Sequence, residues 1–389
     1  MDKVFQSEFL GGFECSTHRR ADGERLDLLA SSAHDRLARR DYAQLACHGI
    51  TGVRDGVRWH LVERTSGHYD WSSFVPMLHA ARFTGMQVAW DLCHYGWPDD
   101  IDIWSAQFVA RFAKFAAAVA RLVRDETEPT PVYCPINEIS YWAWAGAEVG
   151  RMNPTVHGQG GALKRQLVRA SVAAMDAIRH VDPRARFTLA EPLINVVSGS
   201  EEPPHRDAAE AYRRSQFEVH DMLCGRVAPE LGGSAECLDL IGVNFYPDNQ
   251  WYLHGNTIPL GHHAYRPLRD MLREVHERYE RPLWISETGA EGVAKPYWLH
   301  HVCAEVLAAR RNGADVHGIC LYPVLDYHGW DNGRICEVGL LSLPDQDGER
   351  RTCTALLEEL QHQQTRFSEQ TAPHLRVPPA QRREHVRYG

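Results

Sequence analysis

The sequence predicts an α/β fold of one particular kind, a (β/α)8 TIM barrel. The chain has 389 residues, which suits a single barrel with insertions. Short runs rich in β-branched and aromatic residues alternate with helix-like segments along the chain. Two of these runs lead into glutamates, Glu138 and Glu287, where such barrels build their sites. Parallel strands need crossovers and eight of them close neatly, so a closed barrel is favoured over an open sheet.

Eight runs qualify as strands. Several are bounded by Pro or Gly, as at Pro131 and Pro282, and they read as apolar runs of the kind found in strands buried on both faces. In chain order, we expect strands near residues 9–15, 50–59, 86–94, 131–138, 186–192, 238–246, 282–287 and 316–325.

Amphipathic segments lie between these strands. The clearest spans 105–124, where Phe108, Phe112 and Phe115 share one face and Ser105 is a plausible N-cap. Further helices are expected over residues 163–180, 267–279 and 296–311.

The chain shows no internal repeat and no interdomain linker. Residues 1–363 are therefore expected to form one catalytic barrel. Residues 364–389 are polar and basic, contain Pro, and include the run RREHVR. We predict that this tail is docked on the barrel or disordered.

Composition excludes several classes of partner. The net charge is −9 and there is no long basic stripe, which argues against nucleic acid and anionic membranes. No apolar run approaches membrane-spanning length, and the first ten residues do not resemble a signal peptide. Four of the ten cysteines fall inside predicted strands, where we expect them to act as small buried hydrophobic residues. These four are Cys15, Cys93, Cys134 and Cys320. Free cysteines in a chain without a signal peptide indicate a cytoplasmic location.

Polar and aromatic side chains gather at the predicted carboxyl ends of the strands. Sugars need this mixture, because hydroxyls take polar partners and the apolar ring faces stack on aromatic side chains. Two carboxyls, one protonated and one ionised, are the minimum equipment for breaking a glycosidic bond. In strand order the residues are Arg54, Asp91, His94, Asn137, Glu138, Glu191, Asn244, Tyr246, Glu287, Tyr322, Asp326 and Trp330.

Six segments in barrel order resemble the family 1 β-glycosidases, which are clan A glycoside hydrolases. VYCPINE ends in Glu138 and resembles the acid/base strand, and PLWISETG contains Glu287 and resembles the nucleophile strand. Each motif is weak alone, but six in order are specific, and the chain is identified as a divergent member. The segments are 48–59, 85–98, 132–138, 239–246, 282–289 and 321–330.

The resemblance implies retaining hydrolysis of a β-type (equatorial) glycosidic bond through a covalent glycosyl-enzyme. Glu138 would be the general acid/base and Glu287 the nucleophile, held ionised by Arg54. Asn137 would bind the hydroxyl next to the anomeric carbon. The implied substrate-binding residues are Arg54, His94, Asn137, Asn244, Tyr246, Tyr322 and Trp330.

Three departures affect the part of the pocket that identifies the sugar. The glutamine expected after the first strand is not evident between Glu14 and Arg20. Tyr322 replaces the usual tryptophan of the eighth strand. Gly329 occupies the position of a glutamate that usually binds the sugar hydroxyls far from the anomeric carbon. The sugar, the aglycone and the oligomeric state are therefore left open. A transglycosidase with the same machinery and a non-catalytic carbohydrate-binding barrel remain alternatives.

A metal site is the main rival chemistry, because 22 histidines is a high count. The stretch from Gly12 to Ser16 at the end of the first strand, however, offers no His-x-His. His262-His263 and His300-His301 lack a matching carboxylate pattern. No Gly-rich phosphate loop is present. We expect neither a metal nor an organic cofactor.

Overall fold

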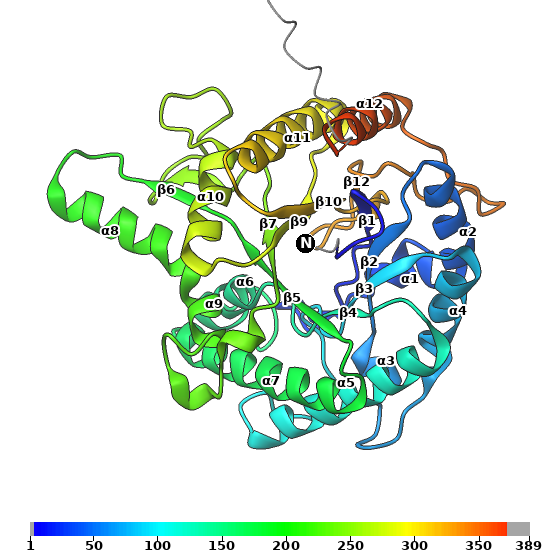
Figure 1. The fold of residues 1–389 in the computed structure, drawn as a ribbon. Helices are drawn as coiled ribbons and strands as arrows, with labels where there is room; N and C mark the ends of the chain where they lie inside the picture. The colour runs from blue at the N-terminus through cyan, green and yellow to red at the C-terminus, as the bar shows by residue number, and fades with distance from the viewer. Residues whose placement is uncertain (1–3, 372–389) are drawn as a thin grey trace, which may run out of the picture.

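The structure is a computed structural model that describes residues 4–371, and it confirms the (β/α)8 barrel (Figure 1). Eight parallel strands follow one another around the barrel in chain order, and the last pairs with the first, with Phe9 opposite Ile319. Each coincides with one of the eight predicted runs. The barrel strands are β1 (Phe9–Gly12), β2 (Gly52–Gly56), β3 (Gln87–Asp91), β4 (Val132–Cys134), β5 (Arg186–Pro192), β7 (Leu240–Asn244), β9 (Leu283–Thr288) and β10 (Val316–Leu321).

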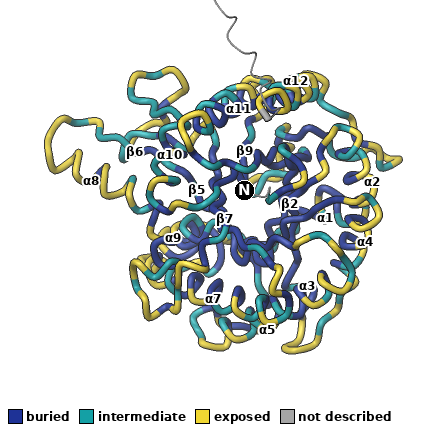
Figure 2. Tube along the Cα trace, in the orientation of Figure 1, coloured by how far each residue is buried: buried dark blue, intermediate teal, exposed yellow. Residues whose placement is uncertain are grey.

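Helices surround the barrel, with their inner faces buried and their outer faces exposed (Figure 2). The four predicted helices are confirmed as α5 (Ala106–Glu126), α7 (Gly160–Val181), α10 (Leu268–Tyr279) and α11 (Lys295–Arg311). Ser105 caps α5 as expected, because its hydroxyl accepts a hydrogen bond from the Phe108 N–H at 3.3 Å. The other α-helices of residues 4–371 are α1 (Leu28–Ser31), α2 (His34–Cys47), α3 (Trp59–Val62), α4 (Val75–Thr84), α6 (Ile139–Trp142), α8 (Pro203–Arg214), α9 (Glu218–Leu223) and α12 (Thr354–Thr371).

Two small sheets lie outside the barrel, in the segments that follow barrel strands. Strand β6 (Asn195–Val197) pairs in parallel with β8 (Gln250–Tyr252), and β11 (Tyr327–His328) pairs in antiparallel fashion with β12 (Ile335–Cys336). Helix α8 projects away from the barrel beyond β6 (Figure 1). Because these segments leave the carboxyl ends of β5, β7 and β10, they build up the mouth of the barrel.

A glycine at the end of β1 makes room for an aromatic ring. A Cβ atom added to Gly12 would lie 2.1 Å from Cδ2 of Tyr322, which is far inside contact distance. Only glycine allows β1 and the residue after β10 to approach this closely. The Tyr322 side chain, which is 2% exposed, therefore lies across the end of the barrel interior.

The last described helix changes the interpretation of the carboxyl-terminal segment. The predicted start of the tail, Gln364, lies inside α12, which continues to Thr371. Leu356, Leu360 and Phe367 are buried, and the Phe367 ring packs edge-on against Phe9 of β1 at 5.2 Å. These apolar residues are few and lie among many polar ones, so the composition of the segment did not indicate a helix with a buried face. The rest of the predicted tail, residues 372–389, lies outside the described residues.

All ten cysteines lie in the described part of the chain and are free. The four expected to act as small hydrophobes, Cys15, Cys93, Cys134 and Cys320, are buried, which confirms that prediction. Within residues 4–371, none of the helices combines the length and the apolar character needed to cross a membrane.

Candidate active site

The predicted site residues converge at the carboxyl end of the barrel, around a cavity of about 720 Å³. Six of the nine line this cavity, namely His94, Glu138, Tyr246, Glu287, Tyr322 and Trp330. The remaining three, Arg54, Asn137 and Asn244, lie behind the lining and hold it in place through hydrogen bonds. The nine side chains come from six segments of the chain, those of β2, β3, β4, β7, β9 and β10, and they meet at the carboxyl end of the barrel as expected.

Glu287, in β9, is buried and both of its carboxylate oxygens are hydrogen-bonded. Arg54 Nη1 donates to Oε1 at 2.6 Å, and the Tyr246 hydroxyl donates to Oε2 at 2.8 Å. Two donors, one of them a guanidinium, stabilise the ionised form of a carboxyl group. These two donors fix the orientation of the Glu287 side chain.

Arg54, in β2, is the hub of this arrangement. Its Nε and Nη2 atoms donate to the two oxygens of Asp91 at 2.9 and 2.7 Å, and Nη2 also donates to Asn137 Oδ1 at 2.6 Å. Burial alone would raise the pKa of Asp91, but Arg54 and His94 outweigh it, and the pKa is lowered. Two buried acids, Asp91 and Glu287, therefore share the Arg54 guanidinium, and the bonds to Asp91 orient this guanidinium toward Glu287.

Glu138 occupies an unusual backbone position. Strand β4 ends at Cys134, so Glu138 is not at the strand end as expected but is the N-cap residue of α6, with φ 40° and ψ 60°. Pro135 lacks an N–H and helps to end the ladder early. A left-handed glutamate costs on the order of 1–3 kcal/mol, and such strain is concentrated at functional sites. The backbone is held by the Glu138 N–H, which donates to Ala190 O at 2.9 Å.

The carboxyl group of Glu138 is held by two neutral donors and no cation. Asn244 Nδ2 donates to Oε1 at 2.8 Å, and the Tyr95 hydroxyl donates to Oε2 at 2.7 Å. Burial, and then the negative charge of Glu287, raise the pKa of Glu138 to about 8, against the opposing effect of these two donors. Glu138 therefore keeps its proton to higher pH than an ordinary glutamate does.

His94 and Asn137 form one wall of the site. Asn137 Nδ2 lies 3.0 Å from His94 Nε2, and His94 Nδ1 lies 3.1 Å from Asp91 Oδ2. In the neutral tautomer with the proton on Nδ1, His94 donates to Asp91 and accepts from Asn137, so every polar atom of the wall has a matching partner. Both side chains are consequently fixed in orientation.

Aromatic residues line the rest of the cavity. Trp144, which is 39% exposed, and Tyr141 lie on its rim, whereas Trp142 is fully buried and donates to Asn153 O at 2.8 Å. Trp144 therefore faces the cavity, whereas Trp142 belongs to the core. Among the described residues, the Tyr322 hydroxyl and the Trp330 Nε1–H are buried without a hydrogen-bond partner. Such groups are available to a bound ligand.

Glu14 and Tyr95 are among the cavity residues that were not predicted as site residues from the sequence. Glu14 follows β1 and is 8% exposed, and its Oε1 accepts from the Ser16 N–H at 3.0 Å and from the Ser16 hydroxyl. Burial raises its pKa. Tyr95 was passed over although it directly follows His94 in segment 85–98, and its hydroxyl donates to Glu138. A polar residue just past a strand end was the only local signal for either.

A cluster of Cys15, Asp91 and His94 brings together atoms of the kind that bind metals. Both oxygens of Asp91, however, are engaged by Arg54, and both ring nitrogens of His94 have partners. A cation here would sit against the Arg54 guanidinium and compete with it for Asp91. These residues are better explained as part of the hydrogen-bond network than as a metal site.

Two other acids were considered from the sequence. Glu191, at the end of β5, accepts from the Ser140 N–H at 3.1 Å, and burial raises its pKa to about 7. Asp326 accepts from the Gly339 N–H at 2.8 Å. Neither lines the cavity. Both side chains hold nearby loops in place.

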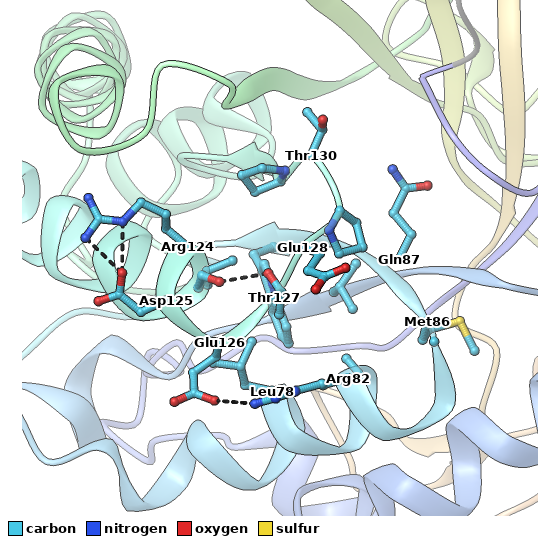
Figure 3. A pocket seen from close by; sticks show the side chains of 17 residues that line it. Leu78, Arg82, Met86, Gln87, Arg124, Asp125, Glu126, Thr127, Glu128 and Thr130 are labelled. Carbon is cyan, nitrogen blue, oxygen red and sulfur yellow. Dashed lines mark hydrogen bonds and ion pairs between the residues drawn. The ribbon is translucent and has the colours of Figure 1, made fainter.

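A second cavity, of about 460 Å³, lies at the opposite end, near the starts of β3 and β4 (Figure 3). Its charged side chains pair with one another near the surface, with Arg82 to Glu126 at 3.1 Å and Arg124 to Asp125 at 2.8 Å. These groups are exposed or half-buried. No set of buried polar groups converges on this space, so it has no features of a reaction centre.

Solved β-glucosidases share this fold. A rice β-glucosidase, determined in a covalent complex with Glc, matches with a TM-score of 0.75 at 15% identity, over 92% of this chain and 98% of that chain. A family 1 β-glucosidase from Thermotoga maritima matches with a TM-score of 0.73 at 14% identity, over 93% and 98% of the two chains. The β-glucosidase from Pyrococcus furiosus gives 0.71 at 16% identity, over 94% and 96%.

No family model matches the chain, and no curated protein matches its sequence. The resemblance to family 1 β-glycosidases is thus confirmed at the level of the fold, which this chain keeps at very low sequence identity.

Proposed function

We propose that the protein is a retaining glycoside hydrolase that cleaves a β-type (equatorial) glycosidic bond. The observation that carries the proposal is a cavity lined by two buried carboxyl groups with different partners. Glu138 has two neutral donors and no cation in contact, and burial and the charge of Glu287 raise its pKa, whereas Glu287 is bound by Arg54 and Tyr246. Retaining glycosidases need this division between an acid and a nucleophile. The fold shared with β-glucosidases supports the same reading.

In the first step, the Glu287 carboxylate attacks the anomeric carbon. The bond from that carbon to the leaving oxygen breaks, and Glu138 gives its proton to the oxygen. The products are a glycosyl ester on Glu287 and the free aglycone. Esterification removes the negative charge that helped to raise the pKa of Glu138, so the carboxylate form of Glu138 becomes more favourable.

In the second step, Glu138 acts as the base. It takes a proton from water as the water oxygen bonds to the anomeric carbon and the ester bond to Glu287 breaks. Glu287 is restored as a carboxylate and Glu138 as an acid. Two inversions at the same carbon give net retention of the β-configuration.

The surrounding residues divide into those that position the carboxyls and those that face the sugar. Arg54 and Asn244 are assigned to positioning, because each donates to a carboxyl group from behind the cavity lining. His94, which lines the cavity, is assigned to a hydroxyl near the anomeric carbon. Asn137 lies behind the lining and is assigned to positioning His94 and Tyr95. Trp330 and Tyr322, with their unpartnered donors, are assigned to the more distant hydroxyls.

The charge of the cavity favours sugars without acid groups. Apart from the two catalytic candidates, Glu14, Asp248 and Glu291 line it, and no lysine or arginine among the described residues does. A uronic acid or a phosphorylated sugar would place an anion among these carboxyls. Neutral sugars are therefore the expected glycones.

The test is a panel of aryl β-glycosides that pairs neutral sugars with uronides and phosphorylated sugars. We expect turnover of at least one neutral glycoside and a first-formed product of β-configuration, observed by proton NMR before mutarotation. A first-formed α-product would overturn retention. Glu287→Ala serves as the control and is expected to be inactive, which excludes turnover by a contaminating enzyme.

A further inference from the structure

An unbroken chain of hydrogen bonds connects the two carboxyl groups. Arg54 joins Glu287 at 2.6 Å and Asn137 Oδ1 at 2.6 Å. Asn137 Nδ2 then donates to the Tyr95 hydroxyl at 3.0 Å, and that hydroxyl donates to Glu138 Oε2 at 2.7 Å. Arg54, Asn137 and Tyr95 are each no more than 1% exposed. Water therefore does not compete for these contacts, and the chain is a fixed part of the site.

The direction of each hydrogen bond in this chain is determined. Asn137 Oδ1 is occupied by the guanidinium, so the amide nitrogen must face Tyr95. The Tyr95 oxygen accepts from that nitrogen, and its own hydrogen points to Glu138. Tyr95 is thus a donor to Glu138, and a donor to a carboxyl group favours its ionised form.

The backbone and packing of Tyr95 show that its position is imposed by the fold. Its φ of 67° is in the left-handed region, which is a costly conformation for a bulky residue. The ring is wedged among other aromatic side chains, with centroids 4.6 Å from His94 and 5.8 Å from Trp330. Its carbonyl accepts from Asn153 Nδ2 at 2.9 Å. The hydroxyl is consequently held at one place relative to Glu138.

We propose that Tyr95 is a positioning residue that holds Glu138 as a carboxylate for the second step of the reaction. The inference rests on the retaining mechanism proposed above. In the first step Glu138 must carry a proton, and the nearby charge of Glu287 keeps it there. After Glu287 is esterified, Glu138 must accept a proton from water, and the hydrogen bond from Tyr95 stabilises the base in the correct orientation. Tyr95 therefore assists deglycosylation more than glycosylation.

The test is Tyr95→Phe, which removes only the hydroxyl. On an activated aryl glycoside, whose first step needs no acid, we expect kcat to fall about 10- to 100-fold, the effect of losing a hydrogen bond to a charged group. KM should fall in parallel because the glycosyl-enzyme accumulates, so kcat/KM should change by less than about threefold. A pre-steady-state burst of aglycone should become larger.

The pH profile of kcat/KM on a substrate with a poor leaving group gives an independent readout. Removing the donor makes Glu138 harder to ionise, so the basic limb should move to higher pH in Tyr95→Phe. Replacement of Tyr95 by 3-fluorotyrosine, a stronger donor, should move it to lower pH. This second variant keeps the size of the side chain and tests the inference even if Tyr95→Phe folds poorly.

The matched control is Tyr133→Phe. Tyr133 is a buried tyrosine on β4 whose hydroxyl has no hydrogen-bond partner among the described residues. Its removal should leave kcat, KM and the pH limbs unchanged.

Two results would overturn the inference. One is a fall in kcat/KM as large as the fall in kcat for the activated substrate. The other is a basic limb that does not move in either Tyr95 variant. Both can occur while Glu287→Ala is inactive and the wild-type product is retained, so they refute the role of Tyr95 and leave the proposed function standing. An active Glu287→Ala variant would instead refute the proposed function itself.

Discussion

Adjacent residues of β2 begin two buried ionic networks with different character. Arg54 points into the barrel and joins Asp91, Asn137 and Glu287. Asp55, on the opposite face of the strand, meets the surrounding layer of helices, where it accepts hydrogen bonds from His34 and Tyr42 of α2 at 2.8 and 2.5 Å. We call these the inner and the outer network.

The outer network is closed and balanced. His34 Nδ1 lies 2.7 Å from Asp41 Oδ2, and Arg350 Nε donates to Asp41 Oδ1 at 2.6 Å. Two carboxylates thus face one guanidinium and one imidazole. Burial opposes charge on His34, but Asp55 and Asp41 outweigh it and raise its pKa to about 9. The His34 ring is fully buried and stacks on Phe13 at 3.6 Å.

The inner network differs in two respects, and both bear on function. It borders a cavity of about 720 Å³, and it includes a carboxyl, Glu138, that has neutral donors but no cation. Burial and the charge of Glu287, with no cation to oppose them, raise the pKa of Glu138. Buried charges alone therefore do not identify a site. A carboxyl group that faces a cavity without a paired cation is more informative, because balanced buried ion pairs also occur as structural parts of a fold.

The largest effect is expected for Glu287→Ala in the inner network. If Glu287 is the proposed nucleophile, turnover should fall on the order of 10⁵-fold or more, as it does when catalytic nucleophiles are removed from enzymes. Azide, which can enter the space left by the carboxylate, should restore activity and give the inverted α-glycosyl azide. The measurement is the rate of aryl glycoside cleavage with product analysis by NMR. A rescued product of β-configuration would contradict the role of Glu287.

Glu138→Gln should separate substrates by leaving group. With a poor leaving group the rate should fall about 10²–10⁴-fold, because the acid is lost. With an activated one, the glycosylation step should be nearly unaffected. In the wild type, kcat/KM should decline as pH rises through about 8, where Glu138 loses its proton. That basic limb should vanish in Glu138→Gln, measured as kcat/KM from pH 5 to 10. A limb that persists unchanged would mean that another group is the proton donor.

His34→Gln tests the outer network and should act on stability. Removing one member of a buried charge cluster costs about 3–5 kcal/mol of unfolding free energy. Glutamine keeps hydrogen-bonding capacity, so a loss of unfolding free energy near the lower end of this range is expected. Because His34 lies outside the cavity, kcat/KM should stay within about twofold of the wild-type value. The measurements are urea unfolding and the standard assay. A loss of activity in excess of the unfolded fraction would show that the two networks are coupled.

The pH dependence of wild-type stability provides a second test of the outer network. The pKa of His34 is raised from an unfolded value near ~6.5 to about 9 in the folded protein. Its contribution is therefore fully present below pH ~6.5 and is lost as pH rises toward 9, by roughly 3 kcal/mol in all. Urea unfolding between pH 6 and 9.5 should show this decline. The decline should be smaller in His34→Gln, and equal slopes in the two proteins would contradict the assignment.

The smallest effect is expected for Glu191→Gln. Its carboxyl group accepts from the Ser140 N–H behind Glu138 and does not line the cavity. The amide oxygen of glutamine can replace that acceptor. The substitution therefore affects only one neutral hydrogen bond, so the rate should change by less than about threefold. The basic limb of the pH profile should remain. A missing basic limb would transfer the role of acid from Glu138 to Glu191.

The sequence by itself determined the architecture and the chemical content of the site. Alternating apolar runs and amphipathic segments are local patterns, and they predicted all eight barrel strands and four helices. Because the carboxyl ends of parallel barrel strands meet at one rim, residues such as Glu287 and His94 could be placed together without knowledge of any contact. The least accurate predictions were the boundaries of elements. The predicted start of the tail, Gln364, lies inside α12, because few apolar residues mark the buried face of that helix.

Only the tertiary structure decided which partners these residues have. Glu138 and Tyr95 are 43 residues apart and Arg54 and Glu287 are 233 apart, so their hydrogen bonds exist only once the barrel closes. Closure also places Glu138 as a left-handed N-cap residue beyond β4. Protonation states follow from burial and from neighbouring charges, which are properties of the closed barrel. No local pattern specifies them, and this is why the sequence did not show that β2 contributes Arg54 to the candidate active site and Asp55 to a separate buried ion cluster.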